Sequence, residues 1–328
     1  MIDASVLIPS YDNRATLLAC IEHLKAQTHP AERFEAIVVL DGSTDGSAEA
    51  LRRCETSFAL KVVEQSNRGR AAALNRAAAE ARGPLLIVID ADILPNPGFI
   101  ASHVAAHADA DVVIGPIPLS DRSPRSFLTD GVKHWADNHA RRMRERSGGF
   151  SCSEIYGANL SIPLAVFRRL GGYREDLRRT EDFHLGKKIL DAGCRVAYCP
   201  EAVAEQIYDK TFFAWCDDFY VDGRSHAGLI REFPEETPNL TIGHYHPVST
   251  VRGMLRPLVI HRPRLGGFVI LCAKLVLESC RRLGLRWKVL SMIQGVVGDA
   301  LFWRGVHDEL GDRERFEALI ESDGRTAG

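Results

Sequence analysis

Acidic side chains follow two apolar stretches of the chain at the point where each stretch ends. Asp41 closes one β-branched run, and Asp90 and Asp92 follow Leu85–Ile89 in the sequence Ile-Asp-Ala-Asp. Two carboxylates separated by one residue can hold a hard cation such as Mg²⁺ or Mn²⁺, whose other positions go to phosphate and water. A cation held this way would stabilise a departing phosphate. The same two acids could equally cap the loop that follows, and the pattern alone leaves both roles open.

A second acidic pair, Glu181-Asp182, stands at the start of a segment with helical spacing. The segment Thr180–Ala192 is predicted to be a helix, with Thr180 as its N-cap. Acids in the first turn of a helix usually interact favourably with the helix dipole. The residue types alone favour that structural role for this pair.

The elements that must position these acids alternate between strand and helix patterns. Strands are expected at Ser5–Pro9, Glu35–Leu40, Leu60–Val63, Leu85–Ile89, Asp111–Ile114 and Arg195–Cys199. Helices are expected over Asn13–Gln27, over Arg70–Arg82, over Pro163–Leu170 and over Thr180–Ala192. Another is expected between the turn at 41–46 and about Arg53, and one more is expected to begin at Pro97. Strands separated by helices of this length predict an α/β fold with a mostly parallel, doubly wound sheet. Ligands of such sheets bind outside the carboxyl ends of the strands, where these acids are expected to lie.

Two other parts of the chain lack this alternation. The polar, Arg-rich stretch Ser120–Gly149 is expected to be an irregular excursion over the sheet edge. Beyond about residue 210, two apolar segments at 265–283 and 286–306 have helical character. We therefore expect an α/β domain over residues 1–210 and a mainly helical appendage over 211–328.

Composition excludes several classes of protein. The chain has 328 residues, a mass of 36.3 kDa and a net charge of −2, which argues against a generally basic nucleic-acid binder. Its eight cysteines form no CxxC pair, so reduced thiols are expected rather than a disulfide framework. No uninterrupted apolar stretch has the length of a spanning helix, and the opening residues lack a signal-peptide pattern. A cytoplasmic location is expected.

Charge is unevenly distributed along the chain. Residues 250–290 hold nine basic residues and one acid, whereas the rest of the chain carries a net charge of −10. The apolar segment Leu265–Leu277 and Trp287 lie within this basic stretch. Such a region could dock on the anionic inner face of a membrane. Alternatively, it forms a helical pair that closes the core, or a homodimer interface.

Six sequence runs occur in an order that resembles the inverting family 2 glycosyltransferases, which have the GT-A fold. They are IPSYDN, VVLDGSTDGS, SNRGRAAALNRA, LLIVIDADILPNP, GANLSIP and TEDFHLGKKILDAGCRV, and they extend from about residue 4 to residue 205. The resemblance therefore covers the α/β part of the chain and implies a nucleotide sugar as the donor.

The resemblance implies that five residues of these runs bind the nucleotide, namely Pro9, Tyr11, Asp41, Arg70 and Asp90. It implies that Pro9 and Tyr11 flank the base and that Asp41 accepts a hydrogen bond from it, uracil being the usual partner. Arg70 stands where relatives often have lysine, and either cation can meet the base or the phosphates. Asp90 is expected to meet ribose or metal, and Asp92 to hold Mn²⁺ or Mg²⁺.

The resemblance also assigns the acceptor side. It makes Asp182 the general base, which takes the proton of the acceptor hydroxyl as that oxygen attacks C1 of the sugar. Glu181 would orient the acceptor or raise the basicity of Asp182. The small residues of Gly157-Ala158-Asn159 are expected to line the acceptor side, where backbone can approach a sugar closely.

Two departures from the family pattern affect these expectations. Many relatives carry a histidine after the last strand as a third metal ligand, but residues 201–206 contain none. Glu205 or His226 are candidate substitutes. The Gln-x-x-Arg-Trp motif of processive synthases is also missing, and Gly223-Arg224 is a partial match to a stretch of non-processive members. A single transfer is therefore expected rather than polymerisation.

The expected function is inverting transfer from a nucleotide diphosphate sugar, with UDP favoured, to an acceptor hydroxyl. A glycan, a lipid-linked or a small-molecule acceptor would fit, in the synthesis of a polysaccharide, glycolipid or other glycoconjugate. One alternative, a GT-A-like nucleotidyltransferase, should have a Gly-rich basic loop after the first strand, where Ser10-Tyr11-Asp12-Asn13 stands. The other, an inactive nucleotide-sugar-binding module, would be expected to have lost some of the acids.

Overall fold

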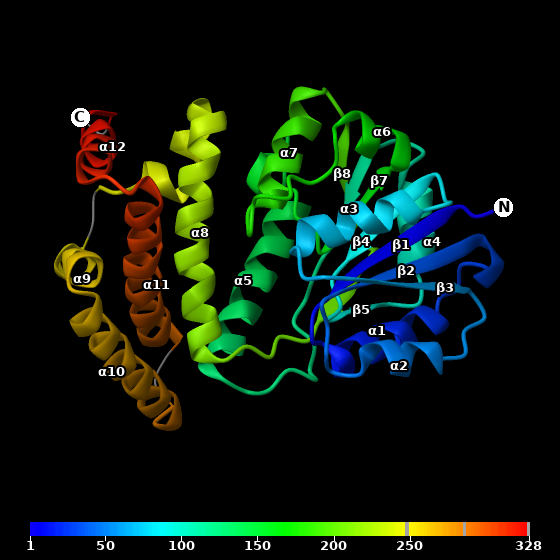
Figure 1. The fold of residues 1–328 in the computed structure, drawn as a ribbon, viewed down its shortest axis with the longest axis horizontal. Coiled ribbons are helices and arrows are strands. Elements are labelled where there is room, and N and C mark those ends of the chain that lie inside the picture. The colour runs from blue at the N-terminus through cyan, green and yellow to red at the C-terminus, as the bar shows by residue number, and fades with distance from the viewer. Residues whose placement is uncertain (247–248, 285–286, 327–328) are drawn as a thin grey trace. The chain divides into compact units, whose positions relative to one another are not determined.

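The computed structural model describes residues 1–246, 249–284 and 287–326, with the elements labelled in Figure 1. The chain divides into two compact units. The first unit comprises Met1–Pro124 and Val132–Asp209, and the second comprises Arg125–Gly131 and Lys210–Gly328.

The first unit is built on a seven-stranded sheet in the order β3-β2-β1-β4-β7-β6-β8. Its strands are β1 (Ala4–Ser10), β2 (Phe34–Asp41), β3 (Ala59–Gln65), β4 (Leu85–Ile89), β6 (Val112–Ile114), β7 (Asn159–Pro163) and β8 (Val196–Tyr198). Strand β1 is parallel to β2 and to β4, and β2 is parallel to β3. Strand β7 is antiparallel to both β4 and β6. A separate antiparallel pair joins β5 (Ile93–Pro95) to β9 (Ala204–Gln206). The predicted α/β fold with a mostly parallel sheet is confirmed.

Helices connect these strands as the alternation predicts (Figure 1). They are α1 (Arg14–Lys25), α2 (Ser47–Arg52), α3 (Arg70–Glu80), α4 (Phe99–Ala106), α5 (Phe127–Arg144), α6 (Leu164–Arg169) and α7 (Glu181–Asp191). The largest difference from expectation is α5, an 18-residue helix inside the stretch that was expected to be irregular. Its buried residues Leu128, Ala136 and Met143 recur at helical spacing, but most of the residues between them are polar, so the apolar pattern was not identified as a helix from the sequence.

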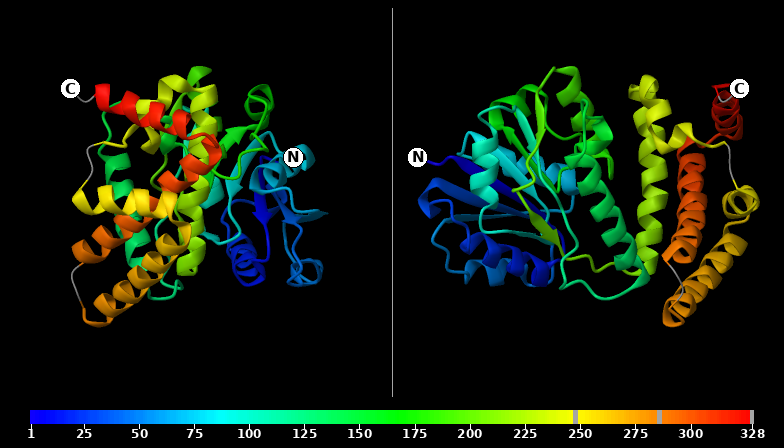
Figure 2. Two further views of the ribbon diagram at one scale, coloured as in Figure 1. Left: turned by 60° about the vertical axis from the view of Figure 1, so that its left-hand side comes forward. Right: turned by 180° about the vertical axis from the view of Figure 1, so that it is seen from behind.

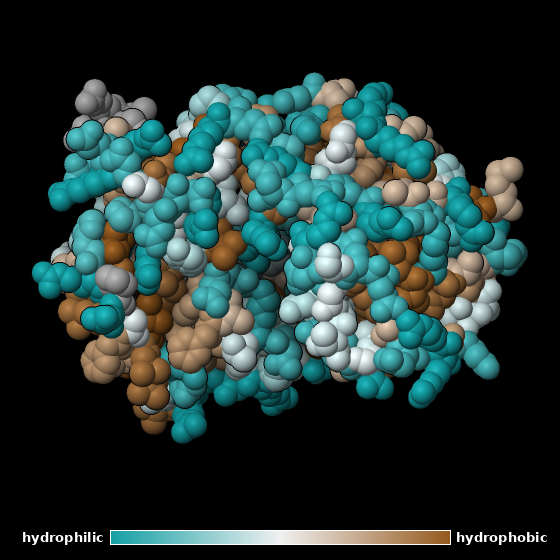
Figure 3. Space-filling view, viewed as in Figure 1, coloured by the Kyte–Doolittle hydropathy of each residue, from teal (hydrophilic) through white to brown (hydrophobic). Residues whose placement is uncertain are grey.

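The second unit is helical in its described part. Its helices are α8 (Phe212–Glu232), α9 (Thr250–His261), α10 (Pro263–Arg282), α11 (Trp287–Leu310) and α12 (Arg313–Thr326), with short 3₁₀ turns at Pro234–Asn239 and Thr241–Gly243. Figure 2 shows α8 and α11 side by side. Glycines allow this approach, because a Cβ on Gly223 would lie 2.0 Å from the Phe302 carbonyl oxygen. Hydrophobic side chains gather over α10 on the face drawn in Figure 3.

A buried arginine joins α9 to α11. The Arg256 guanidinium donates to both carboxylate oxygens of Asp299, at 2.6 and 2.7 Å, and to the Tyr245 carbonyl oxygen at 2.6 Å. Its charged carbon also lies 5.3 Å from the centroid of the Trp303 ring. Arg256 is one of the nine basic residues in 250–290, a region for which a membrane-facing surface and a packed helical pair or dimer interface were both left open. It does not contribute to a membrane-facing surface, because Arg256 is 1% exposed and its charge is neutralised inside the unit.

The structure does not describe the side chains of two further basic residues of this stretch, Arg286 and Lys288. Arg286 lies outside the described residues, and the side chains of Lys288 and the adjacent Trp287 are not described. Within the described ranges, no helix is both long enough and apolar enough to cross a membrane. All eight cysteines are free thiols.

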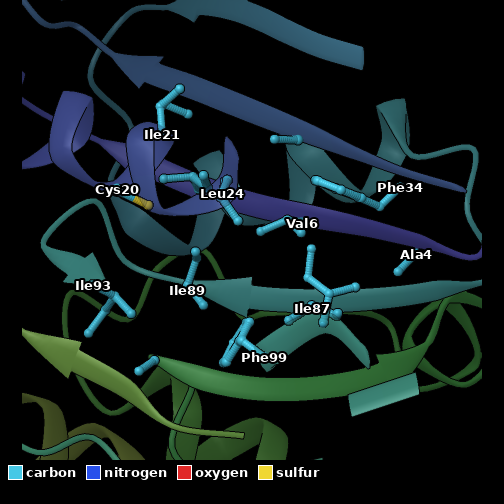
Figure 4. Packing of buried hydrophobic residues seen from close by; sticks show 14 of the residues in the cluster. Ala4, Val6, Cys20, Ile21, Leu24, Phe34, Ile87, Ile89, Ile93 and Phe99 are labelled. Carbon is cyan, nitrogen blue, oxygen red and sulfur yellow. The ribbon is translucent and has the colours of Figure 1, made fainter. Parts of the chain in front are cut away.

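The core of the first unit covers both faces of the central strands. Alternate residues of β1 point to opposite faces, so Val6 and Ile8 join one hydrophobic cluster and Leu7 joins the other. Helix α1 covers the first face, where Leu24 packs close to Val6, Ile87 and Ile89 (Figure 4). Helix α3 contributes Leu74 and several alanines to the second. Strands buried on both faces are rigid supports for the loops at their carboxyl ends.

Strand β7 carries polar residues into this core. The side chains of Asn159 and Ser161 are fully buried and hydrogen-bond to His103, at 2.9 and 2.8 Å. Burial lowers the pKa of His103 to about 4, so that its ring is neutral at pH 7. Because the partners of these polar side chains are more than forty residues away, the sequence alone did not identify β7 as a strand.

Candidate active site

The loops after β1 and β2 are joined at the edge where the predicted donor residues lie. The Thr44 amide donates to Asp12 Oδ1 at 2.7 Å, and the Asp12 amide donates to Ser43 Oγ at 3.1 Å. Asp12 has a φ of +48°, which turns the chain sharply beyond β1. Pro9 is buried within β1, whereas Tyr11 is 53% exposed at the tip of the loop. The Tyr11 ring is therefore available for stacking.

Asp41 organises the loop that leads into α3. Its side chain is buried, and Oδ1 accepts hydrogen bonds from Gln65 Nε2 and from the Arg68 amide, each at 2.8 Å. Oδ2 accepts from the Gly69 amide at 2.7 Å. Gly69 has a φ of +96°, a conformation that glycine adopts without strain. These bonds fix the entry to α3 and so place Arg70, its first residue.

Arg70 is the centre of the site. Its Nε donates to Asp90 Oδ1 at 2.7 Å, and its Nη1 donates to Glu181 Oε1 at 2.9 Å and to Asp182 Oδ1 at 3.1 Å. Nη2 is buried and has no hydrogen-bond partner in the part of the chain that the structure describes. One guanidinium therefore brings together the acid after β4 and both acids at the start of α7.

The electrostatics of this cluster disfavour negative charge on Glu181. Burial lowers the pKa of Arg70, but Asp90, Asp182 and Glu181 outweigh it and raise that pKa well above the usual range. Burial and the nearby Asp182 carboxylate raise the pKa of Glu181, with Arg70 opposing them. The Glu181 side chain is 7% exposed and that of Asp182 is 29% exposed. Asp182 is the more accessible proton acceptor of the pair.

The residue before this pair is strained. Thr180 has a φ of +65°, an unusual conformation for a β-branched residue, and its side chain makes no capping hydrogen bond to α7. Thr180 is thus the N-cap residue of α7, as predicted, and its carbonyl oxygen accepts the His184 amide at 3.0 Å, but its side chain does not cap the helix. Backbone strain of this kind occurs at functional sites, where surrounding structure must hold it in place. Here it sets the direction in which Glu181 and Asp182 leave the backbone.

Gly157 leaves the space that the Asp182 carboxylate fills. A Cβ on Gly157 would lie 2.3 Å from Asp182 Oδ1 and 3.0 Å from the Tyr173 hydroxyl oxygen. Any side chain at this position would displace the carboxylate. Gly157 therefore lies beside the predicted base, at the side where the resemblance places the acceptor.

Tyr173 is a candidate that the sequence analysis missed. Its side chain is buried beside Asp182, and its hydroxyl has no hydrogen-bond partner among residues with described positions. Burial and the negative charge of Asp182 raise the pKa of Tyr173 well above its usual range. The Gly-Gly-Tyr run at 171–173 was a signal for the end of a helix, but nothing in it indicated a contact with residue 182.

The other two residues of the expected acceptor loop lie differently. Ala158 is half-buried and packs against the hydrophobic core. Asn159 is fully buried, and its Nδ2 donates to the carbonyl oxygens of Pro116 and Ala202, at 3.1 and 2.8 Å. The Asn159 side chain is thus committed to the interior and does not join Asp182.

Asp92 stands beside the small sheet. Its Oδ2 accepts a hydrogen bond from Gln206 Nε2 at 3.1 Å, and its carbonyl oxygen accepts one from the Ile207 amide at 2.9 Å. Of the two suggested third ligands, Glu205 is exposed on β9, and His226 packs its ring 5.0 Å from that of Phe302 in the helical unit. Gln206, which was not predicted from the sequence, contacts the Asp92 carboxylate.

The donor set at Asp90 and Asp92 fits a divalent cation that shares its coordination with a substrate. Across the described ranges, no group of three or more His, Cys, Asp and Glu side chains is arranged to hold a metal ion. Mg²⁺ and Mn²⁺ are commonly bound by one or two carboxylates together with substrate phosphates. The two acids, separated by the buried Ala91, meet that requirement but do not form a complete protein cage.

Two relatives with similar sequences are both named as glycosyltransferases. Validoxylamine A glucosyltransferase from Streptomyces hygroscopicus subsp. jinggangensis (strain 5008) is 31% identical over 264 residues, which cover 70% of this chain and 62% of that protein. Glycosyltransferase AglE from Haloferax volcanii is 23% identical over 203 residues, covering 61% and 65% respectively. The chain thus spans less than two thirds of the length of these relatives.

Solved structures share the fold. Mannosyltransferase PcManGT from Pyrobaculum calidifontis, in complex with GDP-Man and Mn²⁺, matches with a TM-score of 0.59 and 20% identity, over 94% of this chain and 87% of that one. TarS from S. aureus, in complex with UDP-GlcNAc, matches with a TM-score of 0.54 and 16% identity, over 95% and 93%. The GT-A fold that the resemblance implied is confirmed. The profile of the family described as Glycosyl transferase family 2 matches residues 5–170, and the chain belongs to this family.

Proposed function

We propose that this protein transfers a sugar from a nucleoside diphosphate sugar to an acceptor hydroxyl. The observation that carries the proposal is the set of bonds from one guanidinium, Arg70, to Asp90 on the predicted donor side and to Glu181 and Asp182 on the acceptor side. Acids from separate parts of the chain thus meet where a sugar would have to lie between a leaving phosphate and an attacking hydroxyl. Family membership supports the same reaction.

The donor is proposed to be a UDP-sugar. The exposed Tyr11 ring would contact the base, and the Asp41 carboxylate, already held by three donors, would accept a further hydrogen bond from it. Arg70 Nη2, buried without a partner in the described structure, is suited to a phosphate oxygen. Solved relatives hold either GDP-Man or UDP-GlcNAc, so the choice of base is a matter for experiment.

Asp90 and Asp92 are proposed to hold Mn²⁺ or Mg²⁺. Such a cation, when bound, neutralises charge on the departing diphosphate. The Gln206 amide fixes one oxygen of Asp92, and Arg70 fixes one oxygen of Asp90. These contacts restrict how the two carboxylates can turn before a donor arrives.

Asp182 is proposed to be the general base of an inverting reaction. It would take the proton from the acceptor hydroxyl while that oxygen forms its bond to C1, and the bond from C1 to the diphosphate breaks on the opposite face. Glu181, whose pKa is raised, would share the Arg70 guanidinium and keep Asp182 in position. Gly157 leaves room for the carboxylate at the acceptor side. Inversion predicts that the product and the donor have opposite anomeric configurations, which NMR of the product would test.

A single transfer to a glycan, lipid-linked or small-molecule acceptor is proposed, in the synthesis of a polysaccharide, glycolipid or other glycoconjugate. The nucleotidyltransferase alternative is not favoured by the loop after β1. That loop contains no glycine between Ser10 and Arg14, and the Asp12 side chain ties it to Thr44. An inactive binding module is not favoured either, because Arg70 still holds the acids together. We also propose that the protein is cytoplasmic and binds peripherally to the inner face of the membrane.

Thermal shift with nucleotides tests donor binding directly. Ligand that binds only the folded state stabilises it by mass action, by about 2.7 kcal/mol at a concentration 100 times Kd. UDP with Mn²⁺ should raise the melting temperature more than UDP alone, and UDP more than uridine. GDP in the same series decides the base. If no nucleoside diphosphate raises the melting temperature in the presence of Mn²⁺, the proposed donor site is wrong.

A further inference from the structure

Helix α10 is apolar on two opposite sides. It buries a narrow side against its neighbours, with Gly266, Ile270 and Leu277 on that side. At Gly266 the approach is close, since a Cβ there would lie 2.8 Å from the Cα of Val259 in α9. The outward side exposes large hydrophobic side chains, as the gathering over α10 in Figure 3 shows. They are Leu265, Phe268, Leu271, Leu275 and Val276.

These exposed side chains form one continuous stripe. At about 100° per residue, they fall within an arc of about 140° that runs along the helix, opposite the buried side. Phe268 is 62% exposed and Leu275 is 57% exposed, so neither is covered by another part of the described chain. A stripe of this width is what a surface helix normally turns toward a core. Exposed apolar surface of this kind marks an interaction site.

Positive charge lies at both ends of the stripe. Arg262 and Arg264 stand at the start of α10, and Arg281 and Arg282 at its end. At about 100° per residue, the exposed Arg264 and Arg282 fall within the arc of the stripe, whereas Arg281 falls on the buried side, one turn after Leu277. None of the four forms an ion pair with another residue of described position. The only acid of α10 is Glu278, which lies 3.8 Å from Lys274. The partner of this face must therefore tolerate apolar contact in the middle and supply negative charge at the ends.

We propose that the outward face of α10 docks on an anionic lipid surface, with the helix lying in the plane of the headgroups. Its 20 residues extend about 30 Å, which allows the whole stripe to enter the boundary between headgroups and acyl chains. The arginines at both ends have side chains long enough to reach lipid phosphates while their stems remain in apolar surroundings. This inference does not depend on the proposed transfer reaction.

Charge distinguishes this partner from a second copy of the chain. Pairing of two α10 faces would place Arg264 and Arg282 close to those of the other copy, and Glu278, already beside Lys274, is the one acid that each helix offers. Like charges at close range disfavour such a pair. An anionic lipid surface supplies the missing negative charge at both ends of the helix.

Flotation with lipid vesicles tests the proposal on the full chain. The protein should float with vesicles of phosphatidylglycerol and phosphatidylcholine in equal parts, and not with phosphatidylcholine alone. Binding should weaken as salt rises, because exposed charges are screened. The double variant Arg264→Gln/Arg282→Gln should bind about 30-fold more weakly, at about 1 kcal/mol for each arginine near an anionic surface. The control is Arg313→Gln/Arg315→Gln on α12, where the two arginines are also exposed but are paired with Glu317 and Asp312, and no change is expected.

The apolar part of the face has its own variant. Phe268→Ser/Leu275→Ser should abolish flotation at low salt and leave the melting temperature unchanged, because both side chains are already exposed. Three results would overturn the proposal. They are no flotation of the unchanged protein at low salt, full flotation of this double variant, or a lipid-free dimer that this variant dissociates. The last result would assign the face to a second copy of the chain.

Discussion

Replacing Gly157 by alanine should displace the Asp182 carboxylate while leaving the fold intact. The new Cβ would lie 2.3 Å from Asp182 Oδ1, whereas ordinary contacts begin at 3.4 Å, so the carboxylate must move by about 1 Å. The Tyr173 hydroxyl oxygen, 3.0 Å from the same Cβ, limits the direction of that movement. A shift of about 1 Å at a reacting group can reduce the rate about 10²-fold, which corresponds to about 2.7 kcal/mol. We expect a loss of turnover of that size.

The assay measures release of the nucleoside diphosphate from the donor, with water or a hydroxyl compound as acceptor. Gly149→Ala is the matched control, because no described atom lies within 4 Å of a Cβ at that position. Both variants should keep the melting-temperature shift caused by UDP and Mn²⁺, since Gly157 contacts the acceptor side. Only Gly157→Ala should lose turnover.

Two results would refute this reasoning. If Gly157→Ala turns over as fast as Gly149→Ala, the position of the Asp182 carboxylate does not control the reaction. The second test combines Gly157→Ala with Asp182→Asn. Residues that act through one group give non-additive losses, so the double variant should be no slower than Asp182→Asn alone. Additive losses would mean that Gly157 acts through something other than Asp182.

The structure makes three further predictions about stability. Tyr173→Phe removes a buried hydroxyl that has no partner within the described chain, so the melting temperature should stay the same or rise, and a drop of several degrees would contradict this. The folded-state pKa of His103 is about 4, below its unfolded value of about 6.5, so the unfolded state takes up the proton first and His103 alone should lower the free energy of unfolding by about 2 kcal/mol from pH 7.5 to pH 5. Other buried histidines such as His226, whose pKa burial also lowers to about 4, add to the total fall and should do so equally in a His103 variant. Urea titrations of the protein and of His103→Gln at both pH values measure that fall, and an equal fall in the variant would rule out His103 as its cause. Arg256→Leu removes the buried, hydrogen-bonded partner of Asp299 and leaves that carboxylate only the more distant Arg252, so it should cost about 3–5 kcal/mol in urea unfolding. Arg252→Leu, whose exposed guanidinium is 3.9 Å from the same carboxylate, should cost under about 1 kcal/mol.

The central strands could be predicted from sequence because burial on both faces leaves a nearly continuous apolar run. Strand β4 has the bounds that were expected, and β1 and β2 differ only at their ends. The same reasoning failed for β7, in which Asn159 and Ser161 are buried polar residues whose partners are distant in sequence. Periodicity indicates which residues avoid water. It does not show which polar residues find partners in the interior.

The candidate site was predictable to the extent that topology determines it. Acids that follow parallel strands must lie at one edge of the sheet, and the bond from Arg70 to Asp90 agrees with that rule. The contacts of Tyr173 and Gly157 with Asp182 depend on how α7 packs after a strained Thr180. No local pattern specifies that packing, so these two contacts had to come from the structure.

The most direct test of the proposed mechanism is the turnover of Asp182→Asn with donor binding measured on the same preparation. The substitution keeps the size of the side chain and its contact with Gly157 but removes the proton acceptor. We predict that turnover falls by between about 10²-fold and 10⁴-fold, while the melting-temperature shift with UDP and Mn²⁺ is unchanged. Turnover close to that of the unchanged protein, with the same donor binding, would contradict the assignment of Asp182 as the base.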